Sequence, residues 1–134
     1  MPAEGVVDAL RKLHAVLVPG GIVVDTQPLS SAPPALAGDV RIGALDMSEW
    51  AGIIAAVDAR VAAVLDSGLF TLESESRFTV TDRYDDGAEF LAYTREYVGT
   101  RIPPELERRA AGERRPVHLD QEIRMRLLGA RAGP

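Results

Sequence analysis

The chain has 134 residues, 46% of them hydrophobic and 26% charged, which is the composition of one ordinary globular domain rather than of a disordered or fibrous chain. Its net charge of -5 and pI near 5.0 argue against nucleic-acid binding, because a protein that binds the phosphate backbone needs clustered positive charge. The chain has no cysteine, which excludes disulfide bonds and thiolate chemistry. It also has no apolar run of membrane-spanning length and no signal-peptide pattern, which predicts a cytoplasmic protein.

The first predicted element is an amphipathic helix that ends at a proline-glycine turn. Apolar side chains recur at three- and four-residue steps from Val6 to Leu17. The sequence VPGG at residues 18–21 ends the helix, because proline cannot continue it and glycine permits left-handed geometry. Ile22, Val23 and Val24 follow without polar alternation, which predicts a strand covered on both faces, as in a parallel sheet.

The middle of the chain contains a predicted loop and the longest predicted helix. Residues 27–39 are rich in proline, serine and alanine and predict a loop or flap, followed by a short strand at residues 40–44. A capping-box pattern begins at Asp46, and apolar side chains from Trp50 to Leu65 form one stripe. This stripe predicts a long helix with Trp50 in the core.

Two long strands with one polar face are predicted in the second half of the chain. Residues 70–81 and 117–127 each alternate apolar and polar side chains, and the first of these segments has either a break near residues 74–76 or none. Between them, a helix is predicted from Asp86 to Gly99, and a short polar helix from Pro103 to about Ala111. We expect the two strands to form an antiparallel pair on an otherwise parallel sheet.

Residues 9–25, ALRKLHAVLVPGGIVVD, resemble part of a class I S-adenosylmethionine-dependent methyltransferase. In that family a helix with a Leu-x-Pro-Gly-Gly end runs into the fifth strand of the sheet. The sequence DSGLF at residues 66–70 resembles the step into the sixth strand, and residues 117–128 would be the seventh, antiparallel strand. The resemblance implies that residues 1–134 form one methyltransferase-like C-terminal half-domain, an α/β fold with a partial Rossmann-like sheet. That sheet has one buried parallel-type strand and a late antiparallel strand pair, flanked by helices.

The part of the family that holds the cofactor has no counterpart in this chain. In the family a glycine-rich turn after the first strand and an acidic residue after the second hold S-adenosylmethionine, and both lie in the N-terminal half. Gly20 and Gly21 precede a strand, whereas a cofactor-binding loop follows one and leads into a helix. No cofactor-binding residue is therefore carried over. The resemblance implies that this chain binds no S-adenosylmethionine alone and that methyl transfer needs an additional half.

Asp25 and Gln27 are the candidate ligand contacts. They follow the predicted buried strand, and open α/β sheets bind ligands at the carboxyl ends of their strands. A loop that hydrogen-bonds only to itself is the favoured alternative, and an independent small enzyme built on this edge is the least favoured function.

Other polar residues have ordinary structural explanations. His14 lies on the predicted first helix and His118 at the start of the last strand, and no spacing pairs either with a catalytic carboxylate. An acidic run lacks calcium-loop spacing and suits a helix N-terminus, while an arginine cluster suits a solvated helix face. We assign no catalytic residue and no metal ligand. The acidic run comprises Asp82, Asp85, Asp86 and Glu89, and the arginine cluster Arg108, Arg109, Arg114 and Arg115.

The missing half would leave the strand at Ile22, Val23 and Val24 with unpaired backbone groups along one edge. We expect this edge to pair with a second copy or a separately encoded partner half, a two-fold homodimer being the simplest solution. Residues 27–39 folding back over the edge is the alternative. Three functions stay open: a methyltransferase-like protein acting with a partner or as a homodimer, a non-catalytic binding or oligomerisation module, and a fragment of a small-molecule methyltransferase truncated before Met1.

Overall fold

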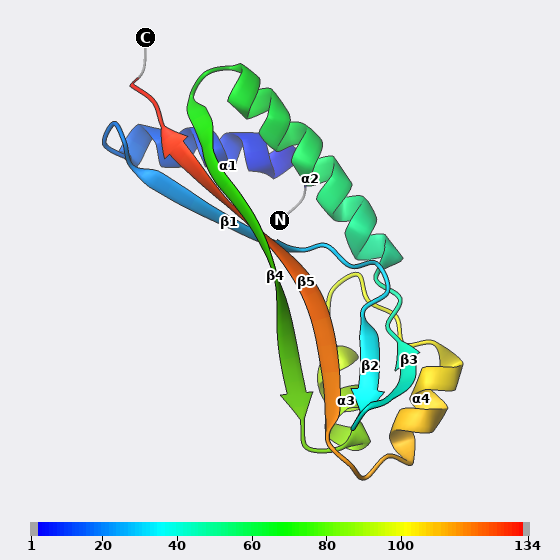
Figure 1. Cartoon of the computed structure of the whole chain (residues 1–134). Coiled ribbons are helices and arrows are strands. Elements are labelled where there is room, and N and C mark those ends of the chain that lie inside the picture. The colour runs from blue at the N-terminus through cyan, green and yellow to red at the C-terminus, as the bar shows by residue number, and fades with distance from the viewer. Residues whose placement is uncertain (1–2, 133–134) are drawn as a thin grey trace. The chain divides into compact units, whose positions relative to one another are not determined.

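The computed structural model describes residues 3–132, which form four helices and five strands (Figure 1). One sheet contains the strands in the order β1-β5-β2-β3, and β4 also pairs with β5. The elements in chain order are α1 (Ala3–Val16), β1 (Ile22–Pro28), β2 (Pro34–Ala37), β3 (Val40–Ala44), α2 (Ser48–Asp66), β4 (Phe70–Tyr84), α3 (Gly87–Thr94), α4 (Pro104–Ala111) and β5 (Val117–Ala130).

Every strand pair of this sheet is antiparallel, so the prediction of a partial Rossmann-like sheet with a parallel-type strand is wrong. The prediction depends on the apolar run at the start of β1, which is typical of a strand covered on both faces. In the structure β1 alternates instead: Ile22 and Val24 are 54% and 57% exposed, while Val23 packs against the core. A strand whose outward residues are also apolar has the same sequence pattern as a fully buried one, and only its neighbours distinguish the two.

The described residues divide into two compact units. Unit 1 comprises residues 3–27, 52–77 and 124–132, and unit 2 comprises residues 28–51 and 78–123. The long strands β4 and β5 each contribute one half to each unit. Each unit has its own hydrophobic core.

In unit 1, α1 and α2 cover the same face of the strands. Leu10 of α1 and the α2 stripe from Ile53 to Val64 belong to one core cluster, which also contains Val23, Phe70 and Leu128 of the strands. Successive side chains of a strand point to opposite faces of a sheet. The side chains that alternate with Val23 and Leu128, such as Val24 and Leu127, therefore lie on the face that these helices do not cover.

In unit 2, part of the predicted flap is a strand. Within residues 27–39, β2 pairs with β3 and with the start of β5, where Ala35 lies opposite Leu119. Ala35 and Ala37 are completely buried in the core of this unit. The prediction of a loop throughout this segment is wrong, because the four residues Pro-Ala-Leu-Ala of β2 are too few to show strand alternation.

The predicted helix start at Asp86 is confirmed, but the helix is shorter than expected. The Asp86 carboxylate accepts a hydrogen bond of 2.9 Å from the Glu89 backbone N–H, which caps α3. The helix ends at Thr94 rather than Gly99, where the backbone has a φ of +65° that glycine adopts at low cost. The first long strand has no break, since β4 runs from Phe70 to Tyr84.

Gly87, the first residue of α3, packs directly on the end of α4, so a substitution at Gly87 tests the packing of these two helices. A Cβ atom at Gly87 would overlap the Ala110 carbonyl group, which belongs to helix backbone and cannot move aside cheaply. We expect Gly87→Ala to lower the free energy of unfolding by about 3 kcal/mol or to prevent folding, measured by urea denaturation. At Gly112 a Cβ atom would meet nothing within 4 Å, so Gly112→Ala should change stability by less than about 0.5 kcal/mol. Equal effects of the two substitutions would contradict the packing described for α3 and α4.

Candidate functional site

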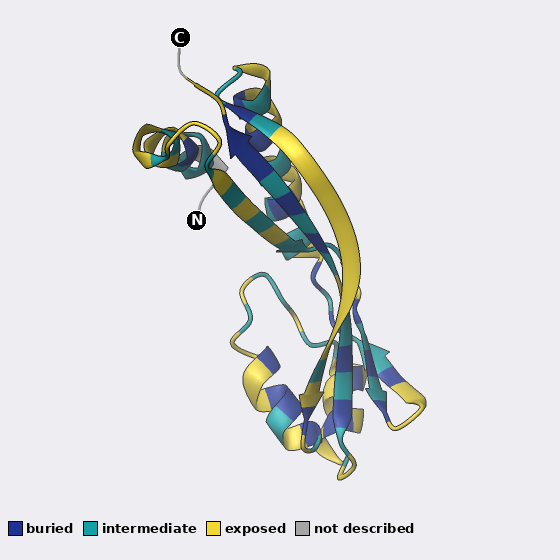
Figure 2. Ribbon diagram, turned by 60° about the vertical axis from the view of Figure 1, so that its left-hand side comes forward, coloured by how far each residue is buried: buried dark blue, intermediate teal, exposed yellow. Residues whose placement is uncertain are grey.

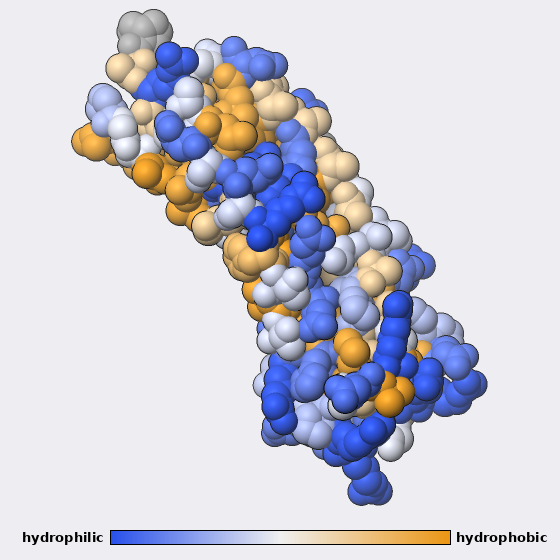
Figure 3. Space-filling model, viewed as in Figure 1, coloured by the Kyte–Doolittle hydropathy of each residue, from blue (hydrophilic) through white to orange (hydrophobic). Residues whose placement is uncertain are grey.

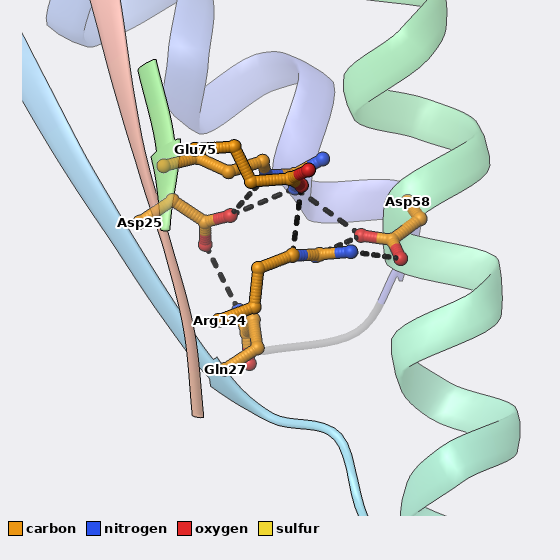
Figure 4. A network of polar contacts seen from close by, with 6 residues as sticks. Asp25, Gln27, Asp58, Glu75 and Arg124 are labelled. Carbon is orange, nitrogen blue, oxygen red and sulfur yellow. Dashed lines mark hydrogen bonds and ion pairs between the residues drawn. The ribbon is translucent and has the colours of Figure 1, made fainter. Parts of the chain in front are cut away.

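Asp25 belongs to an ionic network in unit 1 that joins β1, α2 and β5 (Figure 4). The Arg126 guanidinium donates to Asp25 Oδ2 from Nη2 at 2.7 Å and from Nε at 3.0 Å. Arg124 donates to both oxygens of Asp58, at 2.7 and 3.0 Å, in a two-pronged pair. Arg126 also donates to Asp58 Oδ1 at 3.2 Å, so one carboxylate is shared by two arginines.

The register of β1 on β5 brings these side chains together. Ala130 N–H donates to the Gly21 carbonyl at 2.7 Å, and Leu29 N–H donates to the Glu122 carbonyl at 2.8 Å. These two bonds fit a single antiparallel register, which also places Asp25 directly opposite Arg126. Residues opposite each other on an antiparallel pair point to the same face, so the ion pair follows from the backbone pairing.

The network is largely removed from water. The Arg124 and Arg126 side chains are each 9% exposed, Asp25 is 17% exposed and Asp58 31%. Burial raises the pKa of Asp58, but hydrogen bonds and positive charge from Arg124 and then Arg126 outweigh it and hold that pKa below its ordinary value. The same bonds to Asp58 raise the pKa of Arg124.

Asp25 and Gln27, the two candidate ligand contacts, have partners within the chain. Gln27 Nε2 donates to Asp25 Oδ1 at 3.0 Å, while Arg126 occupies Oδ2. A ligand at this edge would therefore displace Gln27 or Arg126 from Asp25. Arg124 Nε is buried without a hydrogen bond among the described residues, although Glu75 lies 3.8 Å away.

Unit 2 contains a hollow of about 360 Å³ next to the first turn of α2, which we call the Trp50 groove. Its wall is mostly apolar and aromatic, and three polar side chains reach it. The indole Nε1 of Trp50 is buried and has no hydrogen-bond partner among residues 3–132. The lining residues are Pro28, Met47, Trp50, Asp82, Tyr97, Val98, Thr100 and Gln121.

The segment that forms one side of the Trp50 groove is fixed at three points. The Tyr97 hydroxyl lies 2.6 Å from the Tyr84 hydroxyl, and burial followed by this bond raises the pKa of Tyr84. The backbone N–H of Trp50 donates a hydrogen bond to the Gly99 carbonyl at 3.2 Å. Asp46 and Arg101 exchange two backbone hydrogen bonds of 2.7 and 2.9 Å.

The remaining polar residues noted in the sequence have local partners. His14 Nε2 lies 2.7 Å from the Arg131 carbonyl oxygen, and its ring packs edge-on to Phe70. Glu113 is paired with Arg115, whose hydrogen bonds lower the Glu113 pKa to about 2. Within residues 3–132 no three His, Asp or Glu side chains are grouped to hold a metal ion. None of the helices in that range is long and apolar enough to cross a membrane.

Sequence reasoning missed both the ionic network and the Trp50 groove. Arg124 and Arg126 alternate with apolar residues, which was interpreted as a solvated face of the strand. The available signal was Asp58, a carboxylate that borders the apolar stripe of the largely apolar helix α2. A charge in such a stripe needs an opposite charge on the facing element.

Asp58→Asn tests whether the network stabilises unit 1. This substitution leaves two mostly buried arginines with one carboxylate fewer, and we expect it to lower the free energy of unfolding at pH 7 by about 3 kcal/mol. Because the native pKa of Asp58 is lowered, its contribution is complete above the unfolded pKa of about 3.9 and is lost as pH falls through the native value. The difference between Asp58→Asn and the unmodified protein should therefore shrink below about pH 4.

Asp66→Asn, at the exposed C-terminal residue of α2, is the matched control and should change stability by less than about 0.5 kcal/mol. A pH-independent effect of Asp58→Asn, or an equal effect of the two variants, would contradict the role given to the network.

Comparison of the chain with protein-family models, with curated proteins and with solved structures finds no match. The resemblance to methyltransferases therefore stays a prediction from sequence, and the function is argued from the geometry alone.

Proposed function

We propose that the protein is a non-catalytic self-association module, in which β1 of one copy pairs antiparallel with β1 of a second copy across a two-fold axis. The observation that carries this proposal is the open, uncharged outer edge of β1. Among the described strands, β1 pairs only with β5, and the other edge of β1 is unpaired. An unpaired edge offers a row of backbone donors and acceptors to another strand.

The free backbone groups and the apolar side chains of β1 belong to the same residues. In an antiparallel pair, alternate residues direct their N–H and C=O groups toward the partner strand and the others direct them away. Since Gly21 and Leu29 bond to β5, the register directs the N–H groups of Ile22, Val24 and Thr26 outward. A second strand would therefore find its hydrogen bonds at three exposed residues, of which Ile22 and Val24 are apolar.

The open face beside this edge is also apolar. Figure 2 shows the alternation of exposed and half-buried residues along β1, and in Figure 3 hydrophobic surface follows the same strand. Val24 is opposite Leu127 in the register, and Leu127 and Met125 are half-buried on this helix-free face. Contact with another apolar strand would remove this surface from water, which is favourable at roughly 25 cal/mol per Å².

The charge distribution favours a second copy as the occupant. The other long edge strand, β4, has the exposed charges Glu73, Glu75 and Arg77, which are typical of edges that avoid pairing. The one charge on β1 is Asp25, and it is neutralised by Arg126 on the helix-covered face. Two copies of a protein with net charge -5 repel each other overall, but two β1 edges meet without opposing like charges.

Light scattering tests this proposal. We expect a particle of twice the 14.4 kDa chain mass at micromolar concentration. Val24→Lys places two ammonium groups near the two-fold axis and should weaken the dimer at least about tenfold, whereas Val40→Lys on β3 should leave it unchanged. Hydrogen exchange adds a local readout, because the Val24 and Thr26 amides should be protected in the dimer. A monomer at these concentrations, or equal effects of the two lysines, would refute the proposal.

A second candidate function is completion of a methyltransferase by a separately encoded half. The observation that favours it is that the open edge belongs to β1, the strand beside which the resemblance expects that half. This function predicts no heat of S-adenosylmethionine binding by calorimetry for the chain alone, and binding only after a partner half is added. Binding by the chain alone would contradict both the resemblance-based expectation and the non-catalytic role.

A further inference from the structure

The Trp50 groove in unit 2 has the composition of a small-molecule site. It is a shallow hollow, open to solvent, whose volume of about 360 Å³ lies within the range of ligand pockets, and apolar and aromatic side chains line most of it. Trp50 and Tyr97 supply aromatic rings, and Met47 and Val98 supply apolar surface. These residues explain why a molecule with an apolar body would bind in the groove. The charged residue in the wall determines which charge that molecule would have.

Among residues 3–132, Asp82 is the only charged side chain that lines the groove. In the described part of the chain its carboxylate makes no hydrogen bond or ion pair, so a ligand could pair with it without displacing a protein group. A carboxylate beside aromatic rings attracts a cation twice, by direct pairing and through the negative faces of the rings. The same carboxylate repels an anion, and a neutral compound would gain neither interaction.

The groove is also pre-organised. The Gly99 backbone approaches the start of α2 so closely that a Cβ atom at Gly99 would lie 2.9 Å from Trp50 N. Together with the Tyr97–Tyr84 bond and the Asp46–Arg101 bridge, this contact holds the aromatic wall in one position. A site that is already ordered loses less conformational entropy when a ligand binds.

We propose that the Trp50 groove binds a small organic ammonium compound, whose charge pairs with Asp82 and whose apolar body contacts Trp50 and Tyr97. The proposal is independent of self-association, because the residues that would contact the ligand, Asp82, Trp50 and Tyr97, lie outside β1. It assigns a ligand class to a part of the chain for which the sequence suggested only a core tryptophan and a capped helix.

Fluorescence titration tests the proposal directly, because Trp50 is the only tryptophan in the chain. The probes are cyclohexylammonium, the neutral cyclohexanol and the anion cyclohexanecarboxylate. We expect a saturable change in Trp50 emission with the ammonium compound, at least a tenfold higher half-saturation concentration with the alcohol, and no saturation with the carboxylate.

Two variants and a control locate the binding. Asp82→Asn should raise the half-saturation concentration at least tenfold, while Asp39→Asn, which removes an equal charge from an exposed turn of the same unit, should not. Val98→Lys places a cation in the wall at a residue that is 72% exposed, so it should weaken binding without unfolding the protein. The proposal is wrong if cyclohexylammonium gives no saturable response up to about 10 mM. It is also wrong if the alcohol binds equally well, or if the Asp82→Asn and Val98→Lys variants, folded by circular dichroism, bind as the unmodified protein does.

Discussion

The ion pair between Asp25 and Arg126 stabilises the register of β1 on β5, and the arrangement of unit 1 depends on that register. A slip of one residue would move every β1 side chain to the opposite face of the sheet. Asp25 would then point to the open face, and Arg126, with a 9% exposed side chain, would lose its best partner beneath α1 and α2. Arg126 would keep only its longer bond to Asp58, and breaking a buried ion pair costs about 3–5 kcal/mol, so the slipped register is strongly disfavoured.

The same ion pair determines which side chains of β1 are exposed on the open face of unit 1. Since Asp25 must face Arg126, its neighbours in the strand, Val24 and Thr26, must face the other way. Val24 therefore lies exposed opposite Leu127, although its chemistry matches that of a core residue. The buried ion pair of Asp25 and the exposed apolar side chains of Ile22 and Val24 both follow from the alternation of side chains along β1. Asp58 extends this logic to α2, because it binds both arginines and so ties the helix to the strand that carries them.

The sequence predicts the elements of this protein better than their arrangement. Periodicity places α2 and β5 close to their observed bounds, and the capping pattern at Asp86 identifies the start of α3. These features are local, since a cap or an apolar stripe is complete within one helix. The direction of strand pairing is not local: β1 is antiparallel to a strand that follows it by about a hundred residues, and nothing between residues 22 and 28 records that partner.

The two candidate sites were hard to predict for a related reason. Trp50 and Val24 occur in stretches where an apolar residue is the normal choice for a core, and each differs from a core residue only in what packs on it. Trp50 belongs to a helix whose residues Ile54 and Val57 are buried, yet Trp50 itself is only partly buried and lines a hollow together with Tyr97. Val24 is left open because α1 and α2 both lie on the face that Val23 occupies. Whether a side chain is buried depends on its neighbours as well as on its own chemistry. An apolar pattern therefore predicts that a side chain avoids water, but it does not predict whether its own chain, a second copy or a ligand packs on it.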